Sequence, residues 1–356
     1  MTSEFERALL ARGAVLAGFQ NLTLPAHFGD VGGEWRAARE GGAVFCAAFR
    51  GVLAATGEDR AVFLQGMLSN DVAALAPGQG TYAALLDQQG KVVSDLRVYV
   101  EGERILLDAV RWRCPVLQAA LERFIVADDV ELAVGEDETP LVGLEGPLAR
   151  AIAGEALGTN DLPQAPYGHT RIGFQGVSVL AVTASEVDGH GMLLCGPPRS
   201  APALFDACVE AGARPLGMEA LNALRVEAGV PWAGIDMDET VLMLETGRDA
   251  AISFTKGCYL GQEVVERIAA RGHVNRHLVG AVLEGTTLPT IGARLVADGR
   301  EVGYVTSAAR SEALGRVIAL AMVHRKHSAP GERVVIDDGG AATDATVSAL
   351  PFAGPA

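Results

Sequence analysis

The chain has 356 residues, of which 49% are apolar, and it carries a formal net charge of −15. This length predicts two or three domains, and the lack of an apolar run of about 18 residues argues against a membrane partner. The acidic balance, without a long basic run, argues against nucleic acid as the main partner. Residues 1–12 carry both charge signs and no apolar signal segment, so we expect a cytoplasmic protein.

The cysteines and histidines do not predict a metal site. The cysteines are scattered along the chain, at Cys46, Cys114, Cys195, Cys208 and Cys258. Their number is odd and no two form a CxxC pair, so we expect neither a zinc site nor a disulfide framework, and reduced thiols in a cytosol fit the pattern. The histidine pairs 273/277 and 324/327 have helical spacing but no third ligand beside them, so we expect no bound metal.

Residues 1–140 predict a first α+β unit. An amphipathic helix is expected within 4–19, and apolar and polar residues then alternate or recur in patterns typical of further elements. These are helices at 35–40, 59–68 and 115–124, and strands at 43–54, 81–86, 91–100, 104–109 and 130–134. Antiparallel hairpins with helices on one side are typical of α+β architecture.

The rest of the chain predicts a second α+β unit, 141–275, and a separate β-rich unit, 276–356. In the second unit, the helix expected at 216–228 ends where Gly229 and Pro231 follow it. From residue 278 onward the pattern contains only short strands and turns, which predicts a small β-barrel or sandwich. The predicted fold class is therefore α+β: two α+β units followed by a C-terminal β-barrel.

The most distinctive segment is KGCYLGQE, residues 256–263, which sets a cation, a thiol, a phenol, an amide and a carboxylate around two glycines. Apolar residues recur at helical spacing over 264–269, so a loop is expected to lead into a helix that begins near Gly261. Unpaired N–H groups at a helix start favour negative charge and would lower the pKa of the Cys258 thiol. A buried, inert cysteine at a tight helix entrance is the alternative.

Two buried or unusual charges lie on the 216–228 helix. Glu227 is in its last turn, where the helix dipole disfavours a carboxylate by roughly 0.3–1 kcal/mol unless a donor compensates. Arg225 falls on the apolar face of the helix, and a buried guanidinium needs a partner. Structural salt bridges could satisfy both residues, or they could belong to a binding site.

Asp95 lies on the strand expected at 91–100. Apolar residues occupy most even positions of this strand, so Asp95 and Arg97 face away from the core side. Composition alone favours a structural role, in which Asp95 and Arg97 form a solvated ion pair. A binding role is the alternative.

The KGCYLGQE string resembles the signature of the YgfZ-type folate-binding proteins. These are relatives of the glycine-cleavage aminomethyltransferase (T-protein) and are implicated in assembling or maintaining iron–sulfur clusters. The resemblance extends from about residue 20 to the C-terminus. It implies a cloverleaf of two α+β units and a C-terminal barrel around a central channel that holds tetrahydrofolate. It also implies iron–sulfur assembly or client proteins as partners.

The same resemblance implies roles for individual residues. Residues 224–229, LRVEAG, resemble the T-protein string in which a glutamate reads the pterin ring of tetrahydrofolate, so Glu227 and Arg225 are expected to bind folate. A carboxylate suits that role because it can accept two N–H groups of the ring at once. Residues 90–96 resemble the T-protein stretch that carries an Asp-Asp pair beside the folate nitrogens, which gives Asp95 both a binding and a catalytic role.

The remaining predicted site residues come from the KGCYLGQE motif and from the resemblance to the T-protein. Tyr82 and Asn70 resemble T-protein positions that line the central cavity, and Lys256 and Gln262 of the motif are expected to contribute to folate binding. Cys258 is the expected reactive group. The leading hypothesis is a tetrahydrofolate-binding protein that supports iron–sulfur cluster assembly or repair.

Two departures from the T-protein pattern bear on the alternative function, a folate-dependent aminomethyl or methyl transferase. The Asp-Asp pair is reduced to Ser94-Asp95, and the Gly-Tyr-Thr-Gly-Glu loop is replaced by residues 181–186, AVTASE. Both changes weaken the expectation of full aminomethyl transfer. If the protein is an enzyme, we expect this transferase class.

Overall fold

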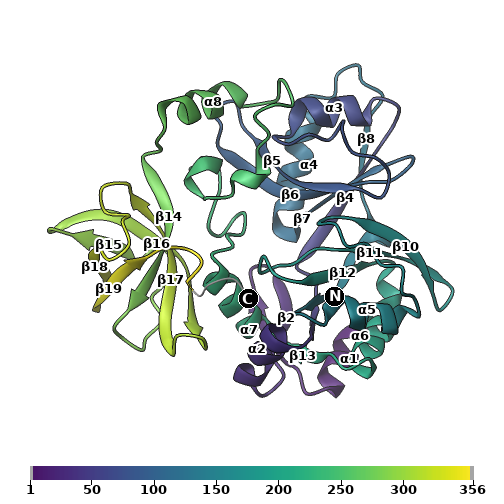
Figure 1. The fold of residues 1–356 in the computed structure, drawn as a ribbon, viewed down its shortest axis with the longest axis horizontal. Coiled ribbons are helices and arrows are strands. Elements are labelled where there is room, and N and C mark those ends of the chain that lie inside the picture. Colours follow the sequence, from purple (N-terminus) through teal and green to yellow (C-terminus); the bar gives the residue numbers. More distant parts are fainter. Residues whose placement is uncertain (1–2, 353–356) are drawn as a thin grey trace.

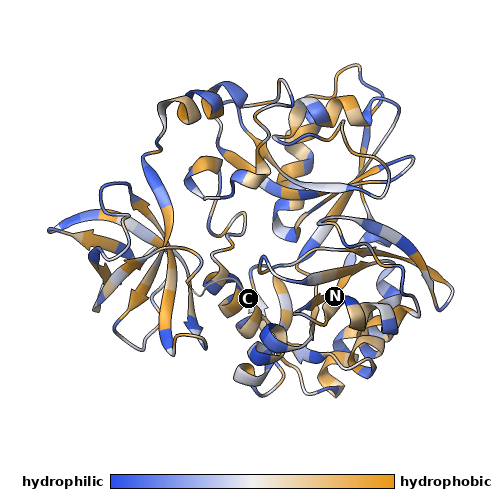
Figure 2. Cartoon of the chain, in the orientation of Figure 1, coloured by the Kyte–Doolittle hydropathy of each residue, from blue (hydrophilic) through white to orange (hydrophobic). Residues whose placement is uncertain are grey.

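The computed structural model describes residues 3–352, which form three lobes (Figure 1). Two mixed units lie on the right of the view and a β-barrel lies on the left. Hydrophobic residues concentrate in the strands and on the helix sides that face them, whereas the loops are largely hydrophilic (Figure 2). This architecture confirms the predicted α+β fold with a C-terminal barrel.

The first unit is built on a five-stranded antiparallel sheet in the order β5-β6-β7-β4-β8. Its strands are β4 (Arg50–Thr56), β5 (Gly80–Leu86), β6 (Val92–Val100), β7 (Ile105–Val110) and β8 (Glu131–Val134). One face packs on helices α3 (Arg60–Met67) and α4 (Cys114–Glu122), where Leu96 and Val98 join a buried aliphatic cluster. Because side chains alternate along a strand, Asp95 and Arg97 of β6 project from the opposite face.

The second unit is built on a six-stranded sheet in the order β10-β11-β12-β9-β3-β13. Its strands are β3 (Ala43–Cys46), β9 (Pro140–Glu145), β10 (His169–Phe174), β11 (Val177–Val182), β12 (Gly191–Cys195) and β13 (Arg214–Leu216). The flanking helices are α1 (Ser3–Ala11), α2 (Val31–Glu40), α5 (Ala149–Leu157), α6 (Ala201–Glu210) and α7 (Met218–Ala228). β13 lies parallel to β3, and the other pairings are antiparallel.

The strand-like stretch predicted over 43–54 is divided into two strands, β3 and β4. The chain turns at residues 47–49, where the Arg50 N–H donates to the Ala47 carbonyl at 2.9 Å, and passes from the second sheet into the first. Both faces of β3 and of the start of β4 are buried, so a continuous apolar run hides the break. The helix predicted within 4–19 is likewise shorter, because α1 ends at Ala11 and β1 (Val15–Phe19) pairs with β2 (Leu22–His27).

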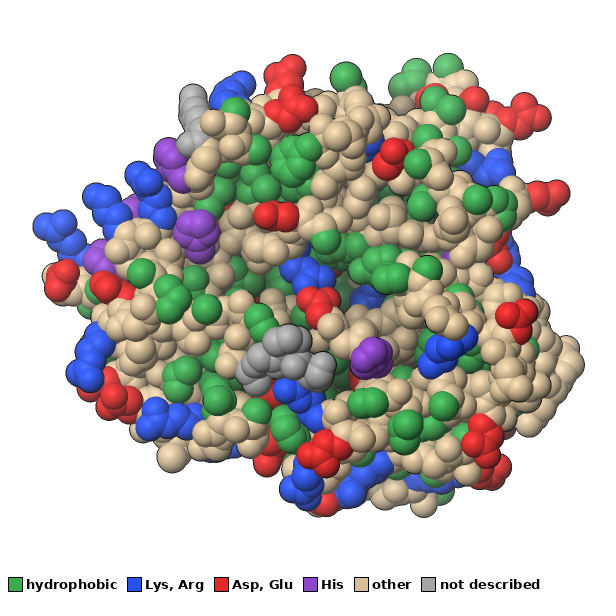
Figure 3. Space-filling view, viewed as in Figure 1, with side chains coloured by type: hydrophobic (Ala, Val, Ile, Leu, Met, Phe, Trp, Pro, Cys, Tyr) green, Lys and Arg blue, Asp and Glu red, His purple; other side chains and the backbone are tan. Residues whose placement is uncertain are grey.

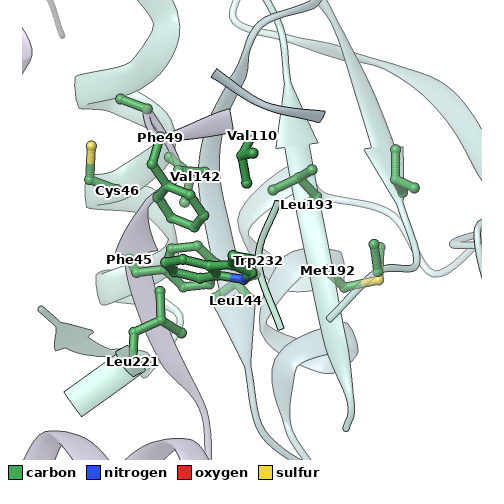
Figure 4. Close-up of a cluster of buried hydrophobic side chains, with 14 of the residues drawn as sticks. Phe45, Cys46, Phe49, Val110, Val142, Leu144, Met192, Leu193, Leu221 and Trp232 are labelled. Atoms are coloured by element: carbon green, nitrogen blue, oxygen red, sulfur yellow. The ribbon is translucent and has the colours of Figure 1, made fainter. Parts of the chain in front are cut away.

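An aromatic cluster fills the space around β3. Phe49 stacks on Trp232 with ring centroids 5.1 Å apart, and Phe45 stacks on Phe49 at 6.0 Å. Leu144 of β9 and Leu221 of α7 lie beside these rings (Figure 4). Trp232, which follows α7, is thereby fixed between the second sheet and the rest of the molecule.

The C-terminal unit is a closed barrel in the order β14-β17-β16-β15-β18-β19, so the predicted alternatives of barrel and sandwich resolve to a barrel. Its strands are β14 (Arg276–Leu283), β15 (Arg294–Ala297), β16 (Arg300–Ser311), β17 (Arg316–His324), β18 (Arg333–Asp337) and β19 (Ala342–Ser348). All neighbouring strands are antiparallel, and β14 closes the circle with β19. The last four residues of the predicted range lie outside the described part of the chain.

Helix α8 (Gln262–Arg271) lies between the first unit and the barrel (Figure 1). The segment before it packs against the first unit, since Ser253 N–H donates to Ser69 O and Leu260 N–H donates to Gly66 O. The second sheet likewise includes β3 from before residue 140, so both strand pairing and packing contacts cross this limit. The limits at 140 and 275 therefore stay predictions. None of the described helices is both long and apolar enough to cross a bilayer.

Candidate functional site

A polar pocket lies between the two sheets and is lined by residues from distant parts of the chain. Charged side chains of both signs gather in the hollow where the lobes meet (Figure 3). The lining residues are Arg50, Tyr82, Asp95, Leu96, Arg97, Tyr167, Ser185, Glu186, Asp188, Val230, Pro231, Trp232 and Arg248. A larger cleft exists elsewhere, but this pocket holds the buried titratable groups, which is where chemistry is expected.

Asp95 and Tyr82 are brought together by the register of β5 and β6. Tyr82 is paired with Arg97, and Asp95 lies two residues earlier on the same face, within diagonal reach. The Tyr82 hydroxyl donates to Asp95 Oδ2 at 2.9 Å. Burial raises the pKa of Asp95, and it outweighs the lowering effects of Arg50 and of the Tyr82 hydrogen bond. Oδ1 of Asp95 accepts no hydrogen bond from the described residues.

The expected solvated pair of Asp95 and Arg97 is not formed. Arg97 instead donates to Glu186 Oε1 at 2.8 Å and to the Ser185 carbonyl at 2.8 Å. Its side chain is 9% exposed, so this is a buried ion pair. The sheet face that looked solvated in the sequence is covered by the second unit.

Arg50 completes a buried network of two arginines and two carboxylates. Its Nε donates to Asp108 Oδ1 at 2.7 Å and its Nη1 contacts Glu186 Oε2 at 3.3 Å. The Tyr99 hydroxyl donates to Asp108 Oδ2 at 2.7 Å. Burial alone would raise the pKa of Glu186, but Arg50 and Arg97 together lower it below its usual range. Equal numbers of opposite charges make the burial tolerable.

The loop after β11 places Glu186 in the pocket wall, and Glu145 of β9 holds this loop through hydrogen bonds. Glu145 is fully buried and accepts the Glu186 N–H at 2.5 Å and the Ser185 hydroxyl at 2.8 Å. Ser185 Oγ in turn accepts the N–H groups of Val187 and Gly189, each at 3.0 Å. Burial raises the pKa of Glu145 to about 8. The loop is therefore held in one conformation by side-chain hydrogen bonds.

Arg248 lies over the Tyr82 ring, with its guanidinium carbon 5.2 Å from the ring centroid. It forms an ion pair with Asp188, whose side chain is 46% exposed. With Arg248 in this position, the open space in the pocket is about 30 Å³. A space of that size holds about one water molecule.

Trp232 contributes an unusual buried donor. Its side chain is 3% exposed, one ring face is stacked by Phe49, and the Arg225 guanidinium lies 4.4 Å from the ring centroid. Its indole N–H has no hydrogen-bond acceptor among the described residues. Buried polar groups are rarely left unpaired, so an unpaired donor on a residue that lines the polar pocket points to an acceptor that the described residues do not supply.

Glu227 does not line this pocket. Its Oε2 accepts the indole N–H of Trp35 at 2.9 Å, and its Oε1 accepts the Ser311 hydroxyl at 2.6 Å. These donors compensate the unfavourable helix-end position of the carboxylate. The contacts of Glu227 correspond to the structural interpretation and give no support to the expected folate contact.

Arg225 is also satisfied within the protein. Its Nη1 pairs with Asp236 Oδ2 at 2.8 Å and its Nη2 donates to Ser307 Oγ at 2.7 Å. The side chain is 2% exposed, and it joins α7 to the barrel strand β16. The folate-binding prediction for Arg225 therefore also lacks geometric support.

Lys256, Gln262 and Asn70 fasten the motif loop and do not line the pocket. Lys256 Nζ donates to the carbonyls of Gln65, Leu68 and Asn70 at 2.6, 2.5 and 2.8 Å. Burial lowers the pKa of Lys256 to about 8. Gln262 accepts the Tyr259 N–H at 3.3 Å. The Asn70 side chain donates to Tyr82 O at 2.8 Å and Ala250 O at 2.9 Å, so it connects the loop to strand β5.

Cys258 is exposed on this loop, so the alternative of a buried cysteine does not hold. Gly257 before it and Gly261 after it have φ of +97° and +84°, a backbone region in which residues with a side chain are strained. Helix α8 begins directly after Gly261. The other cysteines are buried or partly buried, which leaves Cys258 as the accessible thiol of the described residues.

Sequence reasoning missed several pocket residues. An arginine inside the apolar stretch of β4 was a usable signal for Arg50, because a buried guanidinium requires partners. Glu186 had a signal too, since it closes the short segment after the apolar strand β11 and belongs to the altered T-protein loop. Asp188 and Arg248 carry no local signal. Among residues 3–352, no three His, Cys, Asp or Glu side chains are grouped to hold a metal ion.

Two family comparisons cover most of the chain. Residues 5–256 match the GCVT N-terminal domain, and residues 276–353 match the glycine cleavage T-protein C-terminal barrel domain. Similar curated proteins include the aminomethyltransferase of Geobacillus kaustophilus, 30% identical over 96% of this chain and 95% of that protein. The aminomethyltransferase of Thermus thermophilus is 32% identical over 97% of each chain.

A solved structure has the same fold. The crystal structure of glycine cleavage system aminomethyltransferase T from Bartonella henselae superposes with a TM-score of 0.88. The superposition covers 98% of this chain and 97% of that one, at 20% sequence identity. The three-lobed arrangement, including the barrel, is therefore shared along the whole length.

Proposed function

Because the chain belongs to the glycine cleavage T-protein family, we propose that it binds tetrahydrofolate in the polar pocket and uses it in one-carbon transfer of the aminomethyl class. Relatives named aminomethyltransferase align with nearly the full length of this chain. The aligned region therefore includes all three lobes of this chain. The proposal assigns the ligand to the pocket between the two sheets.

The observation that carries the proposal is a pair of unpaired polar atoms on two residues that line this pocket. The indole N–H of Trp232 lacks an acceptor, and Asp95 Oδ1 lacks a donor among the described residues. The pterin ring of tetrahydrofolate offers both complements, N–H donors for the carboxylate and a ring carbonyl for the indole. The Tyr82 and Tyr167 rings, stacked 6.5 Å apart in the same pocket, add apolar ring surface.

Ring binding requires Arg248 to move. The guanidinium now occupies the space over Tyr82 that a planar ligand would take. Asp188 is 46% exposed, but the Arg248 side chain is only 17% exposed, so this ion pair is partly buried. A bound ring must therefore offset the loss of this ion pair and of the contact between Arg248 and the Tyr82 ring.

The two departures from the T-protein pattern, Ser94 and the loop 181–186, change the pocket lining less than expected. Ser94 is fully buried, and its hydroxyl donates to the Asp95 carbonyl, so position 94 does not line the pocket. In the altered loop, Ser185 and Glu186 still line it. The loss of a second aspartate and of the usual loop sequence thus leaves the Asp95 carboxylate in the pocket and the ion pairs of Glu186 in its wall.

Tetrahydrofolate, when bound, supplies the nitrogens that accept the one-carbon unit. The residues of this chain would bind and orient it: Asp95 and Trp232 through hydrogen bonds, and Tyr82 through its ring. Asp95 is also suited to hold a proton, because burial raises its pKa above that of an ordinary aspartate. Arg50, Arg97 and Glu186 keep the surrounding wall fixed through their buried ion pairs.

Calorimetric titration with tetrahydrofolate tests the assignment to this pocket. We expect saturable binding to the wild type and roughly tenfold weaker binding to Trp232→Phe, which keeps an aromatic ring at this position but removes the indole N–H donor. Trp35→Phe is the matched control, because its indole donates to Glu227 outside the pocket. A greater loss in Trp35→Phe would move the site to Glu227 and overturn the assignment.

Turnover tests the chemistry. The wild type is incubated with tetrahydrofolate and candidate aminomethyl donors, and folate-dependent ammonia release is followed. Release that disappears without tetrahydrofolate supports the transferase function. Tight folate binding without any turnover would contradict it and favour the second candidate.

The second candidate is a folate-binding protein that supports iron–sulfur cluster assembly or repair, and the motif loop favours it. Cys258 is exposed on a loop that Lys256 ties to Asn70, and Asn70 in turn bonds the strand of Tyr82. A ligand at Tyr82 could thus influence the loop through two hydrogen bonds. A partner that approaches Cys258 would not need to enter the pocket.

For this candidate, Cys258→Ser should lower the activity of iron–sulfur enzymes in cells while leaving tetrahydrofolate affinity unchanged. The exposed position predicts an intact fold, checked by thermal melting. Cys114→Ser, at a partly buried thiol away from the loop, is the control. Unchanged cluster enzymes in Cys258→Ser cells would contradict this function, and an equal loss of folate affinity would make Cys258 structural.

A further inference from the structure

A second cleft, of about 580 Å³, lies outside the polar pocket and shares none of its lining residues. Its walls come from the start of β4, from α4, from strands β8 and β9, and from the start of α6. A cleft of this size is within the range of small-molecule sites, roughly 300–1,000 Å³. Arg50 lines the polar pocket and Gly51 lines this cleft, so one stretch of β4 separates the two.

The wall of this cleft is mainly aliphatic. It includes Ala48, Val52, Leu53, Val134, Leu141 and Ala201. Cys114 also lines it, and burial raises the pKa of its thiol to about 11, so the thiol stays protonated at neutral pH. The side-chain N–H of Gln118 donates to Glu122 Oε1 at 2.8 Å. The wall therefore offers apolar surface and no free nucleophile.

Arg111 is the exception in this wall. It lies in the turn η1 (Arg111–Arg113) and is half-buried. Its side chain makes one hydrogen bond, from Nε to the Arg50 carbonyl at 3.3 Å. No carboxylate of the described residues pairs with it. Asp137 also lines the cleft, but it is exposed, so water screens its charge.

We propose that this cleft binds a small aliphatic molecule with one anionic group, of the medium-chain carboxylate class. The anionic group pairs with the Arg111 guanidinium, whose Nη atoms make no hydrogen bond among the described residues and whose planar geometry suits a carboxylate. The aliphatic chain lies against the apolar wall, where burial removes it from water. The site is separate from the polar pocket, because no lining residue is common to the two.

Isothermal titration of the full-length protein with octanoate, and with octan-1-ol as the uncharged analogue, tests the proposal. We expect saturable octanoate binding that is at least tenfold weaker in Arg111→Gln and within threefold of wild type in Arg111→Lys. Octan-1-ol should bind the wild type at least tenfold more weakly than octanoate. Arg123→Gln, at an exposed arginine that does not line the cleft, is the matched control and should bind like the wild type.

A second pair of variants tests the aliphatic wall. Val134 is 63% exposed and lines the cleft, so Val134→Trp should fill part of it without disturbing the core and should weaken octanoate binding at least tenfold. Val62→Trp, at a residue 77% exposed on α3, is the control. Absent octanoate binding in the wild type, full binding in Arg111→Gln, or equal loss in both tryptophan variants would each overturn the proposal.

Discussion

Replacing Asp95 with asparagine is expected to weaken tetrahydrofolate binding by roughly 10- to 100-fold, because a hydrogen bond to a charged group contributes about 1.5–3 kcal/mol. Asparagine has the same shape and can still accept the Tyr82 hydroxyl, so the fold should be retained. It cannot accept two ligand N–H groups with a full negative charge. Titration calorimetry of both proteins measures the difference.

The pH dependence gives this prediction a second readout. Burial raises the pKa of Asp95, so the carboxylate becomes protonated at a higher pH than an ordinary aspartate would. If the ionised form binds folate, wild-type affinity should fall as the pH is lowered through this raised pKa. Asp95→Asn should lack this acid limb. Asp298→Asn, at an exposed aspartate of the barrel, is the control. Equal affinities of Asp95→Asn and wild type at every pH would refute the role of Asp95.

The largest stability effect is expected for Asp108→Ala, which should lower the free energy of unfolding by about 3–5 kcal/mol. Asp108 is fully buried and accepts hydrogen bonds from Arg50 at 2.7 Å and from Tyr99 at 2.7 Å. Its removal leaves two buried arginines, Arg50 and Arg97, with a single carboxylate, Glu186. Urea denaturation followed by circular dichroism measures the change.

The matched control for this variant is Asp337→Ala. Asp337 pairs with Arg294 on the barrel surface, where the two side chains are 34% and 55% exposed. Exposed ion pairs contribute about 0–1 kcal/mol, so the control should unfold near the wild-type urea midpoint. A loss of less than about 1 kcal/mol in Asp108→Ala would mean that the network does not need its second carboxylate.

The sequence by itself determined most secondary structure and the fold class. Hairpins such as β5 with β6 lie close to their predicted ranges, since their alternation and turn residues are local signals. The same holds for α7, which ends at Gly229 with φ of +73°. The prediction that only strands and turns follow residue 278 holds over the described barrel. The spacing of the KGCYLGQE motif also predicted the loop and the helix start at Gly261 correctly.

The tertiary structure alone decided which polar residues meet. Arg50, Arg97, Asp108 and Glu186 are separated by up to 136 positions, and no local pattern shows that two sheets bury them against each other. The sequence therefore made Asp95 and Arg97 look solvated and left Arg248 without any signal. The helix pattern placed Glu227 in the last turn of α7, but the groups that hydrogen-bond to it belong to Trp35 and Ser311, which are distant in the sequence. Local patterns fix which backbone shape a segment prefers, whereas the partners of a buried charge depend on how the finished lobes pack.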